Sequence, residues 1–564
     1  MTSPPATAAG PPPHPSALAG AAAGVLTAAV AMGVGQLAAG LTVAQSSPVL
    51  AVGQAAIDLT PLPVKDFAIS TFGANDKTAL LVGILVILAA FAAVIGILAV
   101  RRLALGLAGL AVFTCVGLAA ALTRPTATAA YAIPTLLGAA AGAFALTRLV
   151  RAAGALGSRP GRAAEIRPPA RDLAPPARDL VPPDLPEAAP ASTFTYLPNP
   201  DDRGASRGPA RRRFLVTSGV AAVTAAAGTL VGRELITRHN VSAARAALRF
   251  PRPAVAAPPL PPGANLNIGG LSSFITPNDS FYRVDTALLL PEVDPASWQL
   301  RIHGMVQREV SITFDQLLRR PLIEDYITLT CVSDPVGGPY VGNAKWLGAS
   351  LADLIRQARP LAGADQLLCT SVDGFTSGTP LQVVLDGRDA LLTVAMNGQA
   401  LPVAHGFPAR MVVPGLYGYV SACKWVTDIE VTRFSSAYAY WATRGWSQQA
   451  PIKTESRIDV PVSNATIAPG RTPVAGVAWA QHKGVAAVEV RVDAGPWQQA
   501  RLAAVPDIDT WRQWVWEWNA TPGTHVLEAR ATDATGYTQT AAQAQPPPNG
   551  ASGYPSATVV VHSS

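Results

Sequence analysis

The chain is too apolar for a wholly soluble protein. It has 564 residues, of which 49% are hydrophobic and 14% are charged, and this length allows several domains. The net charge of +7 comes from arginines beside apolar runs and in a Pro/Arg-rich segment, a distribution typical of membrane topology. We therefore expect membrane segments and no nucleic-acid partner.

Four apolar runs follow a polar N-terminus, which we expect to be disordered over residues 1–16. Each run is long enough to cross about 30 Å of hydrocarbon as a helix of about 20 residues. We expect four transmembrane helices in a compact bundle within residues 17–150. The runs are residues 17–41, 78–100, 103–123 and 128–149.

Arginines indicate which ends of these runs face the cytoplasm. Arg101 and Arg102 separate the second and third runs, and further arginines follow the fourth. The positive-inside rule places both positions in the cytoplasm. Residues 151–212, rich in Pro, Arg, Ala and Asp, cannot bury a core and are predicted to be an extended cytoplasmic linker.

A fifth apolar run, residues 213–234, begins at the end of an arginine triplet, Arg211 to Arg213. One interpretation is a fifth transmembrane helix held by cytoplasmic arginines. The other is a twin-arginine-type signal anchor, because the triplet and the following Phe-Leu match Arg-Arg-x-Phe-Leu. Both export the rest of the chain, so residues 235–564 are predicted outside a bacterial-type cell membrane, beginning with a stalk at 235–262.

The C-terminal residues 451–564 have an almost purely strand-like pattern. Short alternating strands are broken by Gly-containing turns, which predicts an all-β immunoglobulin-like sandwich. Trp514, Trp516 and Trp518 fall on one face at a period of two residues. They are interpreted as a packed face, with a carbohydrate platform as the alternative.

The region between, residues 263–450, mixes short strands, turns and a few helices, such as those expected at 313–320 and 350–358. It contains ordered motifs that together resemble the sulfite oxidase family of molybdenum–molybdopterin oxidoreductases. The resemblance implies an α+β molybdopterin-binding domain, followed by a domain that dimerises in the family, so a homodimer is possible. The motifs are FYR (281–283), TLTC (328–331), VGNAKWLG (341–348), SVDGF (371–375), HGFPAR (405–410), VVPG (412–415) and CKW (423–425).

Cys331 ends the TLTC motif and is the residue that the resemblance assigns to the metal. Molybdenum that transfers oxygen atoms prefers soft ligands, here two dithiolene sulfurs of the pterin and one protein thiolate. A free buried cysteine is more often inert. The β-branched Ile-Thr-Leu-Thr run before Cys331 predicts a strand, and the Ser-Asp-Pro and Gly-Gly residues after it predict a turn. This turn chemistry, together with the motif, favours a ligand.

The resemblance also implies a set of cofactor contacts. The phosphate end of molybdopterin requires cationic donors, and its ring amino and amide groups suit a carboxylate. Asp373 is the carboxylate, with a turn role before Gly374 as its alternative, and Arg283 is also a catalytic candidate facing the anion pocket. The implied cofactor-binding residues are Phe281, Tyr282, Arg283, Cys331, Asp373, His405, Arg410 and Lys424.

Four positions depart from the family pattern. Val284 and Asp285 replace the usual Asn-His, Val336 stands where sulfite oxidase has a basic residue, and Trp446 aligns with its substrate-pocket tyrosine. Losing a cation and a hydroxyl weakens binding of a small dianion. The resemblance therefore carries over the cofactor and the two-electron oxygen-atom transfer, while the small-molecule substrate is expected to differ from sulfite.

The leading hypothesis is a membrane-anchored molybdoenzyme that exchanges electrons with an unidentified carrier, because the sequence has no haem, flavin or iron–sulfur motif. One rival is an exported transpeptidase-like enzyme with Cys331 as nucleophile and His405 as base. Another is a non-catalytic cell-surface binding protein. Cys369 and Cys423 are expected to be either a disulfide or two packed thiols.

Overall fold

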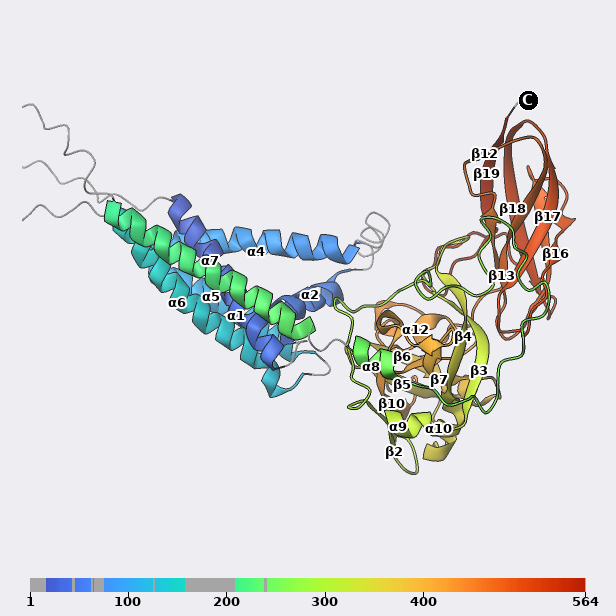
Figure 1. Ribbon diagram of the computed structural model, residues 1–564, viewed down its shortest axis with the longest axis horizontal. Helices are drawn as coiled ribbons and strands as arrows, with labels where there is room; N and C mark the ends of the chain where they lie inside the picture. Colours follow the sequence, from blue (N-terminus) through green and yellow to red (C-terminus); the bar gives the residue numbers. More distant parts are fainter. Residues whose placement is uncertain are drawn as a thin grey trace, which may run out of the picture. The chain divides into compact units, whose positions relative to one another are not determined.

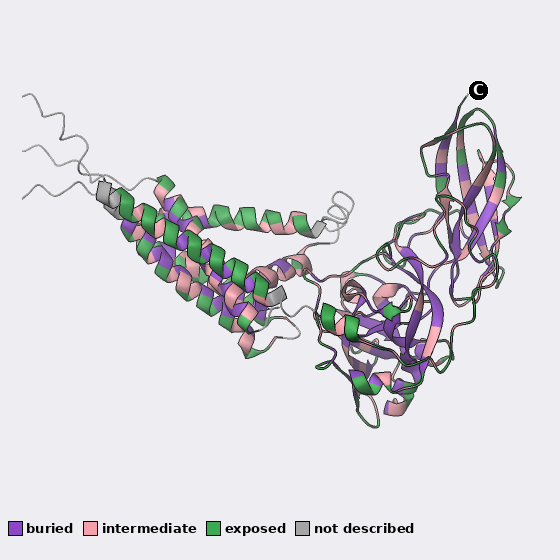
Figure 2. Cartoon of the chain, in the orientation of Figure 1, coloured by how far each residue is buried: buried purple, intermediate pink, exposed green. Residues whose placement is uncertain are grey.

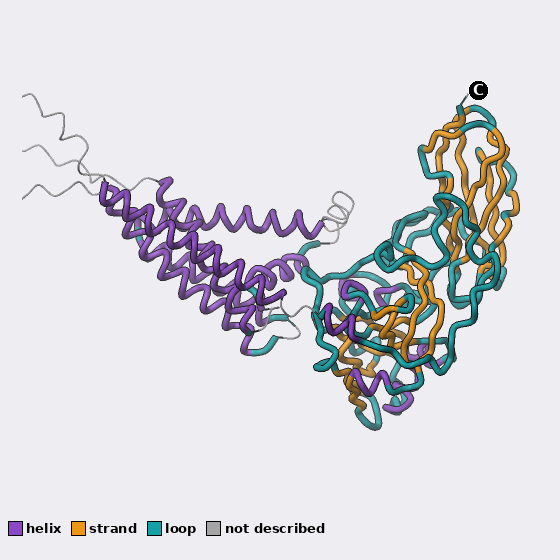
Figure 3. The backbone as a smooth tube through the Cα atoms, in the orientation of Figure 1, coloured by secondary structure: helices purple, strands orange, loops and turns teal. Residues whose placement is uncertain are grey.

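The computed structural model describes residues 17–42, 46–61, 64, 76–124, 127–157, 208–237 and 241–562. They form two compact units, one holding helices α1 to α7 and the other running from α8 to strand β19 (Figure 1). The first unit is helical, and strands and loops dominate the second (Figure 3). The predicted disordered segment 1–16 and residues 158–207 of the predicted linker lie outside the described residues.

Five helices of the first unit are long and apolar enough to cross a membrane. They lie at the five apolar runs predicted from the sequence, and α7 extends a few residues into the predicted linker. The short α2 was not predicted, because its 12 residues are too few to span a bilayer. The helices are α1 (Ala17–Leu41), α2 (Pro48–Leu59), α4 (Asp76–Arg101), α5 (Leu103–Leu122), α6 (Ala132–Gly157) and α7 (Gly208–Thr237), with the 3₁₀ helix η3 (Ala129–Tyr131) before α6.

Small residues let the backbones of these helices approach closely. Helix α1 packs against α4, α6 and α7. A Cβ atom on Gly24 would lie 1.9 Å from the carbonyl oxygen of Ala92, and one on Gly33 would lie 2.5 Å from that of Ala225. Many large apolar residues of these helices are instead exposed, and exposed positions recur along α4 and α7 in Figure 2. Small residues inside and apolar residues outside are typical of helices packed in a membrane.

The α+β part of the second unit contains two sheets. One is mixed, in the order β2-β1-β10-β5-β6, with β1 parallel to β10. The other has the order β3-β4-β7-β8, with β9 also paired to β7. The strands are β1 (Gln299–Gly304), β2 (Val310–Thr313), β3 (Leu322–Thr330), β4 (Val341–Ser350), β5 (Gln366–Ser371), β6 (Thr376–Pro380), β7 (Leu391–Met396), β8 (Gln399–Ala400), β9 (Arg410–Val412) and β10 (Val426–Thr432).

Short helices cover these sheets, and two were predicted. Thr313 forms a capping box with Gln316 at the start of α9, and Ser350 accepts a hydrogen bond from the backbone N–H of Asp353 in α10. Such caps satisfy the free N–H groups of the first turn. The helices are α8 (Ser242–Ala247), α9 (Phe314–Leu318), α10 (Leu351–Ala358), α11 (Leu381–Leu385) and α12 (Gly418–Ser421), with 3₁₀ helices η5 (Val403–His405) and η6 (Ala442–Arg444).

Strand β3 is buried on both faces. Tyr326 belongs to the main hydrophobic core, and Ile327 belongs to a second cluster on the opposite side. Residues from the predicted stalk lie along the edge of β3 that does not pair with β4, where the Glu324 N–H donates to the Val255 carbonyl at 2.8 Å. The strand is therefore a rigid element at the centre of the domain.

The C-terminal part consists of two sheets packed around one core. Val488 and Val490 in one sheet and Trp514 and Trp518 in the other are buried together, which confirms the tryptophans as a packed face. The first sheet is β11 (Glu455–Val460), β13 (Gly470–Trp479), β17 (Arg512–Ala520) and β16 (Arg501–Leu502). The second is β12 (Ala465–Ile467), β19 (Ser556–Val561), β18 (Gly523–Asp533), β14 (Val485–Val492) and β15 (Gln498–Gln499).

The close approach of α1 and α4 gives a testable prediction. A Cβ atom on Gly96 would lie 2.1 Å from the Gly20 carbonyl oxygen, whereas one on Gly83, also in α4, would meet nothing within 4 Å. Gly96→Ala should destabilise the bundle by about 1–3 kcal/mol through overpacking. Gly83→Ala should be neutral or slightly stabilising. Thermal unfolding in detergent measures the stability of both variants. Equal stability of the two would contradict the close packing of α1 against α4.

Candidate active site

Cys331 lies directly after the last residue of β3. Its side chain is buried, at 8% exposure. Its N–H donates to the Tyr340 carbonyl at 2.9 Å, and its own carbonyl accepts from the Asp334 N–H at 3.1 Å. Residues 331–340, defined here as the Cys331 turn, connect β3 to β4. The strand and turn predicted around this thiol are both present.

Asp334 organises the Cys331 turn. Its Oδ1 accepts from the Tyr340 N–H at 2.8 Å, and a Cβ atom on Gly338 would lie 2.3 Å from that same oxygen, so only glycine fits there. Burial raises the pKa of the Asp334 carboxyl to about 7. Its Oδ2 is buried and has no hydrogen-bond partner within the described part of the chain.

Aromatic rings form one wall of the site. Phe281 and Tyr282 stack with ring centroids 5.2 Å apart, and Phe281 also meets Trp346 and His405 edge-on at 5.9 and 5.5 Å. Burial raises the pKa of Tyr282 well above its usual value, and the nearby Cys331 raises it further. The structure therefore brings the FYR and TLTC motifs together.

Three cations gather beside this wall. Arg410 is buried and donates to the carbonyls of His405 at 3.2 Å and Ala422 at 3.3 Å. Lys424 and Arg283 both bond Asp285 Oδ2, at 2.9 and 2.7 Å. Burial lowers the pKa of Arg410 to about 10 and that of Lys424 to about 8, so both remain charged at neutral pH.

His405 is neutral at pH 7. Burial, with contributions from Arg410 and Lys424, lowers its pKa to about 4. Its Nε2 faces the Asn278 carbonyl at 3.2 Å, where an N–H donor is required. This contact makes Nε2 a hydrogen-bond donor, so that nitrogen is not free to accept a proton as a base. The histidine therefore supports the wall of the site.

These residues fit a molybdopterin cofactor. Burial raises the pKa of Cys331 to about 11, so the free side chain is a thiol, and a bound metal would displace its proton. Desolvated cations of like charge favour an anion between them, and Asp285 is the carboxylate that pairs with two of the three. A buried soft ligand next to a cationic pocket matches the metal and phosphate ends of the cofactor.

The other predicted residues have mixed surroundings. Asp373 uses Oδ1 to accept from the Phe375 N–H at 3.1 Å, which is its turn role, and it is near enough to influence the pKa of Cys423. Val336 is half-buried in the Cys331 turn. Trp446 packs against Tyr419 in the main core. The substrate-pocket roles of Val336 and Trp446 remain predictions.

Cys369 and Cys423 are buried free thiols, so the structure has packed thiols and not a disulfide. Cys423 Sγ faces the Cys369 carbonyl oxygen at 3.9 Å.

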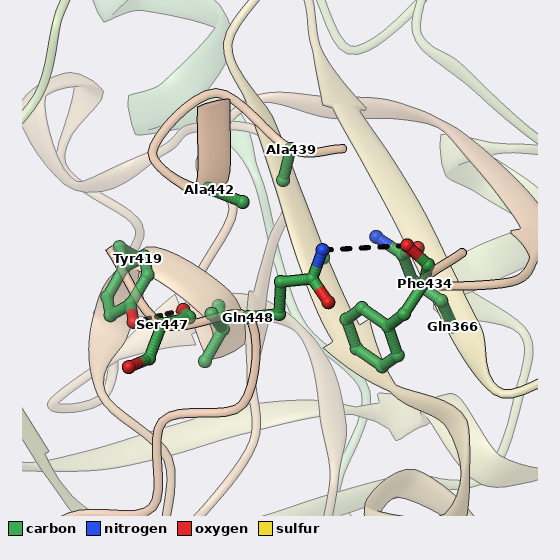
Figure 4. Close-up of a pocket in the computed structure, with 9 residues that line it drawn as sticks. Gln366, Tyr419, Phe434, Ala439, Ala442, Ser447 and Gln448 are labelled. Atoms are coloured by element: carbon green, nitrogen blue, oxygen red, sulfur yellow. Dashed lines mark hydrogen bonds between the residues drawn. The ribbon is translucent and has the colours of Figure 1, made fainter. Parts of the chain in front are cut away.

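A small hollow elsewhere in the same domain is distinct from this site. Gln448 Nε2 donates to the Phe434 carbonyl at 3.5 Å, and the Tyr419 hydroxyl donates to the Ser447 carbonyl at 2.5 Å (Figure 4). None of the predicted site residues is among those that line the hollow, so it is not the expected cofactor pocket.

Sequence reasoning missed three groups of the candidate site. Asp334 was recognised only as a turn residue, and Asp285 only as a departure from the family. Arg457, which donates to the Gly338 carbonyl at 3.1 Å, comes from the C-terminal domain and had no signal at all. For Asp285, the sequence signal was a carboxylate two residues after the arginine of the FYR motif.

The sequence of the chain is similar to known molybdopterin-dependent oxidoreductases. Residues 287–441 match the family model described as oxidoreductase molybdopterin binding domain. The chain is 30% identical over 291 residues to sulfite oxidase of Gallus gallus, covering 43% of this chain and 62% of the relative. It is 29% identical over 286 residues to mitochondrial sulfite oxidase of Mus musculus, covering 43% and 52%. The chain thus spans less than two thirds of these relatives.

Among solved structures, the sulfane dehydrogenase SoxCD of Paracoccus pantotrophus matches with a TM-score of 0.42 and 22% identity, covering 47% of this chain and 74% of that one.

The lowered pKa of His405 gives a second prediction. The unfolded chain takes up a proton near pH 6.5, whereas the folded chain resists protonation down to about pH 4. Stability of the cofactor-free protein should therefore fall as pH drops through this window, by about 3 kcal/mol from this residue. Buried carboxyl groups with a raised pKa, such as Asp334, have the opposite effect on stability: they stabilise the folded protein as the pH falls.

The comparison of His405→Gln with the wild type isolates the histidine. The variant should lose less stability than the wild type between pH 6.5 and 4 in thermal denaturation. Parallel pH profiles for the two proteins would contradict a buried neutral His405.

Proposed function

Because the chain belongs to the sulfite oxidase family of molybdopterin-dependent oxidoreductases, we propose that it performs two-electron oxygen-atom transfer on a small molecule outside the cytoplasm. The family's domain binds a molybdenum–molybdopterin cofactor. The observation that carries the proposal is the buried Cys331 at the end of β3, beside Tyr282 and a desolvated cationic pocket. When bound, the cofactor would supply a metal that donates an oxygen atom while it accepts two electrons, or accepts an oxygen atom while it donates two electrons.

The chain's own residues have distinct roles in this proposal. Cys331 is the protein ligand of the metal, and the Phe281 and Tyr282 rings line the pterin and exclude water. Arg410 and Lys424 hold the phosphate end, because their buried guanidinium and ammonium groups gain most from an anion. Asp373 offers its second carboxylate oxygen to the pterin ring.

The residues proposed to face the substrate favour a molecule other than a small dianion. Val336 supplies no charge in the Cys331 turn, and Asp334 is the buried ionisable group beside it. Arg283, the remaining catalytic candidate, is 41% exposed and paired with Asp285. A desolvated dianion would require unpaired donors here, so we propose a small substrate of lower charge.

Membrane anchoring is the second part of the proposal. Five long apolar helices support it, as do the exposed arginines Arg211, Arg212 and Arg213 at the start of α7, in a pattern that suits a fifth helix or a twin-arginine-type anchor. An external electron carrier would exchange electrons with the site. The two C-terminal sheets support an immunoglobulin-like, dimerisation-type domain at 451–564, following the cofactor domain at 263–450.

A cysteine nucleophile is a weaker explanation of the same residues. The raised pKa of Cys331 disfavours a thiolate, and His405 Nε2 is directed at Asn278. A purely binding protein does not explain why Arg410 and Lys424 are buried in the same domain as a buried thiol.

Metal analysis tests the proposed function. Full-length protein from cells that make molybdopterin should contain about one molybdenum per chain. Cys331→Ser should reduce molybdenum content or activity at least about 100-fold, since even residues that support a ligand contribute 10–100-fold. Cys115→Ser, at an exposed thiol of α5, is the matched control and should change neither. Wild-type protein without molybdenum or pterin would overturn the proposal.

Reporter fusions test the topology. A reporter that is active only outside the cytoplasm should be active when fused after residue 562 and inactive after residue 157. A reporter that requires the cytoplasm should give the reverse. Activity of the first reporter after residue 157 would contradict the assignment of the arginine-rich ends to the cytoplasm.

A further inference from the structure

The C-terminal β domain contacts the strand that leads to Cys331. Gln481, which follows β13, is buried and donates from Nε2 to the Thr328 carbonyl at 3.1 Å and to Thr330 Oγ1 at 3.2 Å. Both acceptors lie in the last three residues of β3, immediately before Cys331. A side chain of the C-terminal domain therefore fixes the strand end that carries the thiol.

Backbone groups of the same domain complete this contact. The Thr328 N–H donates to the Asp509 carbonyl at 3.0 Å, and the Trp511 N–H donates to Thr328 Oγ1 at 2.7 Å. The outer edge of β3 has polar groups that must be satisfied when buried. Here the C-terminal domain satisfies them, much as a further strand would.

The Cys331 turn is held from the same side. Arg457 in β11 donates from Nη1 to the Gly338 carbonyl at 3.1 Å and from Nη2 to Ser272 Oγ at 2.8 Å. Asp459 bonds its Nε at 2.6 Å, which orients the planar guanidinium. Pro555 lies 3.4 Å from the position of a Cβ atom on Gly337. The C-terminal domain thus contacts both the strand before Cys331 and the return of the turn after it.

We infer that the C-terminal β domain positions the Cys331 ligand, with Arg457 as the positioning residue for the turn and Gln481 for the strand end. This inference rests on the proposed function of Cys331 as a metal ligand. The direction of its Cα–Cβ bond is set by the backbone on both sides, and both sides are held by this domain. Small displacements of supporting groups typically change the affinity or activity of a metal site 10–100-fold.

Arg457 is the better residue to vary, because the chain offers a matched control. Arg471 lies in the same domain, is 80% exposed and pairs with the half-exposed Glu517. Arg457→Met and Arg471→Met each remove one guanidinium from an ion pair in this domain. The Cys331 turn loses a hydrogen bond in the first variant alone.

The experiment uses the full-length, cofactor-loaded protein. Arg457→Met should shift the molybdenum(V) electron paramagnetic resonance spectrum and lower kcat about 10–100-fold, with a smaller change in KM. Arg471→Met should match the wild type in both. Arg457→Lys keeps the charge and one donor, so it should recover part of the wild-type spectrum, which a general loss of domain stability would not explain.

Hydrogen exchange gives a readout that needs no cofactor. Backbone amides of the Cys331 turn should exchange faster in Arg457→Met than in Arg471→Met, and Gln481→Met should have the same effect at the end of β3. Gln481→Met also serves as the second variant if Arg457→Met folds poorly.

The outcomes separate the two proposals. Wild-type protein without molybdenum overturns the proposed function, while hydrogen exchange still decides whether the domain holds the turn. Wild-type protein with molybdenum and an Arg457→Met spectrum equal to that of the wild type overturns the positioning role. Equal exchange of the turn in the Arg457 and Arg471 variants overturns it as well.

Discussion

Desolvation of charged and ionisable groups around Cys331 is the constraint on which the site depends. The candidate site buries the Cys331 thiol and, separately, an arginine, a lysine and a histidine that influence one another, and burial is the largest cause of the pKa shift of each. Such a cluster is costly unless a ligand compensates for the lost hydration. The cofactor expected of the family offers a metal for the thiol and an anion for the cations.

Buried ionisable groups must be held in place by the surrounding structure, and around Cys331 this structure is strand β3 and its neighbours. This strand is covered on both faces by hydrophobic clusters and pairs with β4 along one edge. Along its other edge it contacts residues of the predicted stalk and of the C-terminal domain. The thiol therefore projects from an element that has no free side. The interaction of Gln481 with Thr328, two residues far apart in the sequence, thereby supports the strand that carries the proposed metal ligand.

Local patterns predicted much of the structure, because local physics determines them. Apolar runs of about 20 residues predict helices, and the β-branched residues before Cys331 predict a buried strand. Contacts between distant residues leave no such pattern: Arg457 and Gly338 are 119 positions apart, and Lys424 and Asp285 are 139 apart. Arg457 and Asp285 match no motif in their own stretch of sequence, so their partners become evident only in the folded domain.

Asp285 shows how one such contact tunes the site. Without it, Arg283, Arg410 and Lys424 would present three unit charges, because His405 stays neutral at pH 7. The carboxylate bonds two of these cations and leaves a net charge of about +2, close to the magnitude carried by a phosphate monoester at neutral pH. Asp285 also keeps Lys424 charged, since it raises the lysine pKa against the effect of burial. Asp285, at a position that departs from the family pattern, thus lowers the net positive charge of these three cations.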